Sequence, residues 1–146
     1  MKLNVGDIVA YQAVDHRVEG IIDYALPDRL LRLVAMVADR QVRFLEPMVV
    51  ADRVLLLSEI APLDISSPPP ATIDHRGESY LLKMSGEATV SIAGRVAGRQ
   101  AGSCRLWRFH AAGGQYLQFE AWPDGIRMLE GTSIHKGMIE IRPATP

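Results

Sequence analysis

Apolar and polar residues alternate along much of the chain, with the period of two that indicates β-strands. The alternation is clearest in three segments: residues 17–24, 88–95 and 116–122. A period of two places successive side chains on opposite faces of a strand, so one set is expected in the core and the other toward solvent. In the third segment this separates Leu117 and Phe119 from Gln118 and Glu120.

Turn-forming residues separate these runs where hairpins need them. They lie at residues 74–77, 85–86, 113–114 and 123–125. Many short strands at this spacing favour a barrel or a sandwich over alternating strand and helix units.

The second half of the chain repeats the first at a constant offset of 74 residues. Five identities between residues 40 and 60 follow this offset: Gln41, Glu46, Arg53, Leu55 and Ile60 meet Gln115, Glu120, Arg127, Leu129 and Ile134. Upstream, Gly20 meets Gly94. Chance would give roughly one or two identities over this window, so the pattern indicates an internal duplication.

The repeat divides the chain into two β-modules, residues 1–61 and 72–146, joined by a proline-rich linker at 62–71. Three consecutive prolines stiffen that linker and exclude it from a sheet interior. We therefore predict an all-β fold with little helix. It consists of two tandem, internally repeated β-meander modules that resemble SH3-like barrels or form one sandwich.

Residues 27–40 fit two interpretations. Asp28 is a suitable helix N-cap, and the apolar positions that follow suit a helix as well as a strand. We favour a strand, because the corresponding segment of the second half, residues 104–112, alternates as a strand does.

Composition and charge set the broad class of the protein. Hydrophobic residues make up 48% and charged residues 23% of the chain, which is typical of a globular domain. The formal net charge of −1 gives no general attraction to nucleic acid, so we expect no nucleic-acid partner. Cys104 has no second cysteine to pair with, and no segment looks like a signal peptide or a transmembrane span. We therefore expect a cytoplasmic protein.

A cluster of basic residues is the first candidate site. Residues 88–119 contain no acid, and they hold four arginines and an adjoining histidine: Arg95, Arg99, Arg105, Arg108 and His110. Guanidinium groups suit phosphate or carboxylate, which predicts an anion site or a surface for an acidic partner. The alternative is that these arginines pair with acids elsewhere in the chain.

Glu46 and Glu120 are the second candidate, because they occupy equivalent positions in the two modules. Two facing carboxylates in a cleft between the modules could act as acid and base or hold a polyamine, with Trp122 beside them. The alternative is that each glutamate pairs with an arginine, and the equivalent residues Arg53 and Arg127 are suitable partners.

Metal and nucleophile motifs do not stand out. The four histidines lack the short spacing of a zinc site, and a strand would hold Cys104 roughly 20 Å from His110. We expect no metal, no cofactor and no catalytic residues.

Several short motifs extend over nearly the whole chain, at residues 6–9, 18–20, 43–46, 77–80, 107–109 and 120–123. Together they resemble an uncharacterised bacterial family, the domain-of-unknown-function family 4178. The resemblance implies an all-β, cytoplasmic protein without an assigned activity. The genomic surroundings of that family imply an accessory role in envelope stress.

Two functional hypotheses follow. The first is a non-enzymatic binding or assembly module with a protein partner or a homodimer, since exposed strand edges invite pairing. The second is a small-ligand-binding or minor hydrolytic protein that uses the acidic cleft, with a small anion or a polyamine as the ligand.

Overall fold

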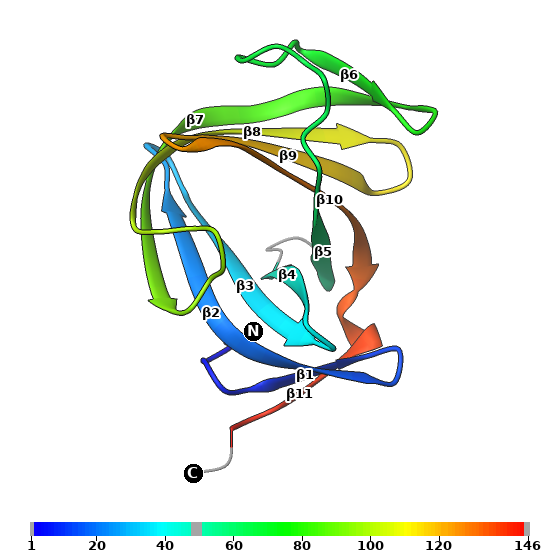
Figure 1. Cartoon of the computed structure of the whole chain (residues 1–146). Coiled ribbons are helices and arrows are strands. Elements are labelled where there is room, and N and C mark those ends of the chain that lie inside the picture. The colour runs from blue at the N-terminus through cyan, green and yellow to red at the C-terminus, as the bar shows by residue number, and fades with distance from the viewer. Residues whose placement is uncertain (1, 48–50, 145–146) are drawn as a thin grey trace.

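The computed structural model describes residues 2–47 and 51–144, which form eleven antiparallel strands and one short 3-10 helix (Figure 1). The strands are β1 (Ile8–Tyr11), β2 (Val14–Ala25), β3 (Leu30–Ala38), β4 (Gln41–Pro47), β5 (Arg53–Ile60), β6 (Thr72–His75), β7 (Glu78–Gly94), β8 (Gly102–Ala111), β9 (Gln115–Trp122), β10 (Gly125–His135) and β11 (Ile139–Arg142). The helix η1 (Lys136–Met138) precedes β11. The all-β prediction is confirmed, and residues 30–38 form a strand.

Eight of the strands close into a single barrel. Their order is β2-β3-β4-β5-β10-β9-β8-β7, and β7 pairs back with β2 to complete the closure. The two halves of the chain therefore share one barrel, which is joined at a β5–β10 seam and a β2–β7 seam. Closure leaves the central strands without free edges.

An apolar core occupies the inside of the barrel. Buried side chains from seven of the eight barrel strands form one cluster, in which Tyr24, Phe44 and Leu106 are among the largest members. The contributing positions alternate along each strand, as the pleat of a sheet requires.

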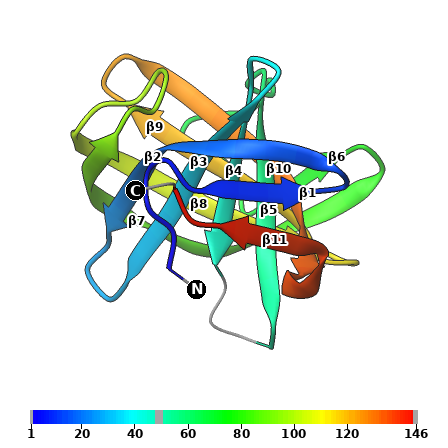
Figure 2. The ribbon, with the colours of Figure 1, turned by 90° about the horizontal axis from the view of Figure 1, so that it is seen from below.

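Two further apolar clusters lie outside the barrel wall. β1 and β11 cover the first, which includes Val34, Met36 and Leu45 (Figure 2). β6 covers the second, which includes Phe109 and Phe119, together with Leu63 from the segment between β5 and β6. Strands between an inner and an outer core read as continuous apolar runs, which explains why residues 27–40 resembled a helix.

Both faces of β9 are buried, whereas the sequence predicted that one of them would face solvent. Its apolar residues Leu117 and Phe119 pack in the outer cluster under β6. Gln118 and Glu120, which alternate with them, are fully buried, so neither face of β9 is turned to solvent. A polar strip thus enters the barrel along β9.

At the β2–β7 seam, the backbone of β2 lies very close to the loop that follows β7, and this contact fixes the position of the loop. Gly20 pairs with Gly94, and a Cβ on Gly20 would lie 2.3 Å from the backbone oxygen of Arg95. The absence of a side chain at residue 20 therefore lets the loop cross this end of the barrel.

Candidate functional site

A hollow of about 940 Å³ opens at the end of the barrel where β4 and β8 end and β9 begins. Its wall combines apolar residues such as Leu31, Met84 and Tyr116 with a group of charged side chains. We call this hollow the basic mouth. Its charged residues are Asp28, Arg29, Arg32, Glu46, Arg53, Lys83 and Arg108.

Basic side chains outnumber acids in the basic mouth by five to two. Arg32 is occupied by Asp23, to which it donates two hydrogen bonds of 2.7 and 2.8 Å. Arg53 and Lys83 have no carboxylate partner among the described residues. Arg53 instead donates from Nε to the hydroxyl of Ser133 and from Nη2 to its carbonyl oxygen. The mouth therefore holds positive charge that no acid of the described chain neutralises.

A β-bulge places one of these charges. Leu82 pairs with Phe109 and Met84 with Arg108, so Lys83 is the extra residue on β7. Residues two apart in a regular strand point to the same face. Across the bulge they do not, because Leu82 belongs to the outer cluster and Met84 packs on the inner core. Bulges often redirect a side chain beside a functional site, and this one brings Lys83 to the rim of the mouth.

A chain of polar contacts leads from the basic mouth into the barrel. Nη1 of Arg108 lies 2.6 Å from Oε1 of Glu46. Gln118 accepts hydrogen bonds from Nε and Nη2 of the same guanidinium through its Oε1 atom. The amide nitrogen of Gln118 donates to Oε2 of Glu120 at 2.7 Å. Arg108 is thus held in a fixed orientation from the interior.

Glu120 is the centre of this chain. It is fully buried and accepts four hydrogen bonds. The donors are Tyr24 Oη at 2.8 Å, Gln118 Nε2 at 2.7 Å, Trp122 Nε1 at 2.8 Å and Arg99 Nε at 3.1 Å. Burial, followed by the charge of Glu120, raises the pKa of the Tyr24 hydroxyl well above its ordinary value, so Tyr24 remains a donor.

Arg99 completes the network at the opposite end of the barrel. Its Nη1 atom donates to Glu59 at 2.9 Å, and its guanidinium lies 4.9 Å from the ring centre of Phe44. Glu59 also accepts from Arg127 at 2.9 Å. Burial lowers the pKa of Arg99, but the charges of Glu120 and Glu59 outweigh this effect and raise it overall, so Arg99 stays charged.

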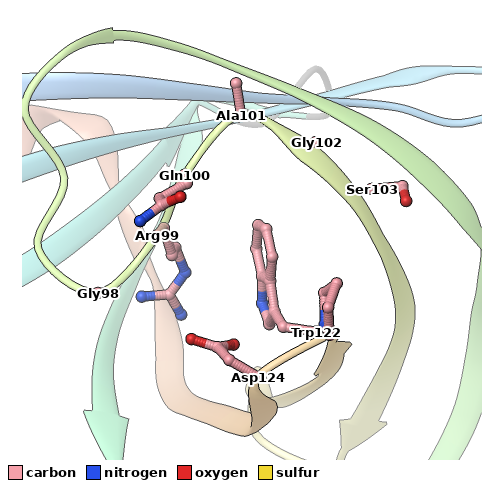
Figure 3. Close-up of a pocket in the computed structure, with 9 residues that line it drawn as sticks. Gly98, Arg99, Gln100, Ala101, Gly102, Ser103, Trp122 and Asp124 are labelled. Carbon is pink, nitrogen blue, oxygen red and sulfur yellow. The ribbon is translucent and has the colours of Figure 1, made fainter.

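A second hollow, of about 370 Å³, lies beside Arg99 and Trp122 (Figure 3). Figure 3 shows Asp124 at the same opening. The side chain of Arg99 has no exposed surface, so its charge is not presented to this space. This hollow is therefore a weaker candidate for an ionic ligand than the basic mouth.

His110 lies in the basic mouth with its ring centre 4.2 Å from that of Tyr116. Burial, then the charges of Arg108 and Lys83, lower its pKa from the ordinary value of 6.5. The imidazole is therefore neutral at pH 7. Burial, followed by the charge of Glu120, raises the pKa of the Cys104 thiol to about 12, so this cysteine is an inert part of the core.

The structure separates the predicted basic cluster into four places. Arg108 and His110 meet in the basic mouth, whereas Arg99 is buried near the other end. Arg105 is exposed and lies 5.6 Å from the ring centre of Trp107, and Arg95 is exposed beyond the end of β7. The five residues therefore do not form one patch.

The two glutamates also differ from expectation. Glu46 borders the basic mouth, but Glu120 is fully buried, so they do not line a shared cleft. Each is paired with an arginine, yet the partners are Arg108 and Arg99, not Arg53 and Arg127. Trp122 lies beside Glu120 and donates to it, as described above. The second hypothesis requires a cleft lined by both glutamates, and the described residues do not form one around this pair.

Sequence reasoning missed Lys83 and Tyr116 as residues of the mouth and treated Arg53 only as an ion-pair partner. The chain gives no signal for the bulge at Lys83. Tyr116, Gln118 and Glu120 do share one face of the predicted strand, and this pattern could have linked the mouth to the interior.

The described residues contain neither a cluster of metal ligands nor a membrane-spanning helix. They hold no group of three or more His, Cys, Asp or Glu side chains arranged to bind a metal ion. They also include no helix with the length and apolarity needed to cross a bilayer.

Comparison with known proteins gives one result. The sequence model of the family described as "Domain of unknown function (DUF4178)" matches residues 4–136. Searches of the curated proteins and of the solved structures find no match. Because the matched region covers most of the chain, the protein belongs to the DUF4178 family.

Proposed function

We propose that this protein is a non-enzymatic binding module and that its ligand is a small molecule with a negatively charged group, held in the basic mouth. The observation that carries the proposal is the presence of Arg53 and Lys83, without carboxylate partners among the described residues, around one hollow that also contains Arg108. Charges in such a concave, partly apolar site attract an anion more strongly than the same charges on an open surface.

The shape and stiffness of the site support the proposal. A hollow of about 940 Å³ is of the size that small-molecule sites occupy. Its floor is rigid, because Gln118 and Glu120 fix Arg108 from within the barrel. A preorganised charge loses little conformational entropy when a ligand binds.

Isothermal titration calorimetry at low ionic strength tests the proposal, with benzoate and inorganic phosphate as probes. The double variant Arg53→Gln/Lys83→Gln is expected to lose most of the anion affinity of the natural chain. The matched control is Arg17→Gln/Arg105→Gln, which removes two exposed charges outside the mouth and is expected to bind normally. Equal affinity in the two double variants, or no binding of either anion to the natural chain, would refute the proposal.

A second candidate function is self-association or pairing with another protein through a strand edge. β6 and β11 end the strand order, so each leaves one edge unpaired within the described chain. Such edges accept an added strand. Sedimentation velocity over a hundredfold concentration range is expected to show a dimer, and a monomer throughout would exclude self-association.

We also propose that residues 1–61 and 72–146 are two copies of one module joined by residues 62–71. The seams support this division, because each contains a pair separated by the offset of 74 residues: Gly20 with Gly94, and Leu57 with Gly131. A twofold relation between the halves requires equivalent residues to meet at its axis. Two chains divided within residues 62–71 and produced together are expected to associate into the native barrel, and failure to associate would count against the division.

A further inference from the structure

We infer that Glu46 occupies the position on Arg108 where the anionic group of the ligand binds. This position, which we call the seat, binds an organic carboxylate. The inference rests on the proposed function and names the ligand class of the same site. Glu46 would then be an internal competitor, a residue that tunes affinity without being required for binding.

The orientation of Arg108 leaves one edge of its guanidinium for an anion. Gln118 accepts one N–H from Nε and one from Nη2, so the edge formed by Nη1, which faces Glu46, and the second N–H of Nη2 is not used by Gln118. The aromatic ring of Tyr116 lies beside the guanidinium, with its centre 5.9 Å from Cζ. These contacts prevent the arginine from turning to follow a moving partner, so an anion must come to this edge.

Glu46 fills this position without good hydrogen-bond geometry. Its Oε1 atom is buried 2.6 Å from Nη1, yet it forms no hydrogen bond within the described residues. The contact of this oxygen with Arg108 is therefore one of charge and not an aligned hydrogen bond. A ligand that enters from the mouth is free to adopt the in-plane geometry that a guanidinium prefers, and Glu46 is not, because its backbone is fixed in β4.

The surroundings favour a carboxylate on an apolar body. The seat already holds a planar carboxylate, that of Glu46, against Nη1 of Arg108. The arginine alone does not separate a carboxylate from a phosphate, because it binds either through two N–H groups. Leu31, Met84 and Tyr116 supply an apolar wall that inorganic phosphate cannot use. Lys83, at the rim, would neutralise the extra charge when Glu46 and the ligand are both present.

Calorimetric titration of benzoate into Glu46→Gln tests the inference. Like charges brought together at a binding site cost several kcal/mol, and partial exposure of the mouth reduces this, so removal of the Glu46 charge is expected to strengthen benzoate binding about tenfold. Glu46→Asp keeps the charge but withdraws it by one methylene, and an intermediate affinity is expected. Glu140→Gln removes an exposed acid on β11 and is expected to leave affinity unchanged.

The possible results separate the two claims. If benzoate binds Glu46→Gln and the natural chain equally, Glu46 is not a competitor, although the proposed function stands. If phosphate binds Glu46→Gln more tightly than benzoate does, the seat is not built for an organic carboxylate. If neither anion binds the natural chain, the proposed function fails, and the inference fails with it. Benzyl alcohol, which has the ring without the charge, is expected to bind no variant.

Discussion

Replacement of Glu120 by glutamine tests the role of the polar network in the stability of the barrel. The change keeps the size of the side chain but removes the charge opposite Arg99 and turns an NH2 group toward donors. The natural carboxylate accepts four hydrogen bonds, and the side chains of Glu120 and Arg99 are both fully buried. Loss of one member of a buried ion pair costs about 3–5 kcal/mol. We expect a loss of this size, a large part of the roughly 5–15 kcal/mol that stabilises a domain.

The measurement is urea unfolding at pH 7, followed by tryptophan fluorescence, since the indole of Trp122 donates to Glu120. The matched control is Glu140→Gln, at an exposed position of β11, which is expected to change stability by less than about 0.5 kcal/mol. A milder variant, Tyr24→Phe, removes one donor to the buried carboxylate and is expected to cost about 1.5–3 kcal/mol. A loss below about 1 kcal/mol for Glu120→Gln would show that the network does not stabilise the fold as described.

Three further changes test other parts of the fold by urea unfolding. Gly20→Ala is expected to lose about 1–3 kcal/mol because its Cβ would overlap the Arg95 carbonyl, and wild-type stability would disprove the close approach at the seam. Leu106→Ala, at a fully buried position, is expected to cost about 2–5 kcal/mol, and a smaller loss would argue against a packed interior. The lowered pKa of His110 means that the unfolded chain binds its proton more readily, so its contribution to stability is present above about pH 6.5 and is lost as the pH falls toward the folded-state pKa. His110→Gln is expected to make stability less sensitive to acid over that range, and an unchanged pH profile would contradict this origin.

Local structure was readable from the sequence because turns and strands leave local signals. The predicted turns at Gly77 and at Gly113–Gly114 have positive φ angles of 78°, 76° and 74°. The turn predicted at residues 85–86 is wrong, because both residues pair with β8 inside the long strand β7. The strand at residues 30–38 was ambiguous because it is buried against both the inner and the outer cluster, so its apolar residues run together. Closure into one barrel depends on the β2–β7 and β5–β10 pairings, which join residues far apart in the chain.

The site was only partly readable. Arg108 and His110 were identified from the sequence, but their surroundings depend on strand register, which places Arg108 opposite Gln118. Alternation also could not show that Gln118 and Glu120 are buried, since β9 is covered on both faces. The bulge at Lys83 shifts the pattern by one residue, and nothing in the local sequence indicates it.

The most direct test of the central claim is a backbone amide NMR titration of the natural chain with benzoate at low ionic strength. Saturable shifts are expected at Lys83, Arg108 and Tyr116, around the basic mouth. Shifts centred instead on residues 98–103 and Trp122, at the opposite end of the barrel, would place the site elsewhere. A spectrum that benzoate leaves unchanged would contradict an anion site in the mouth.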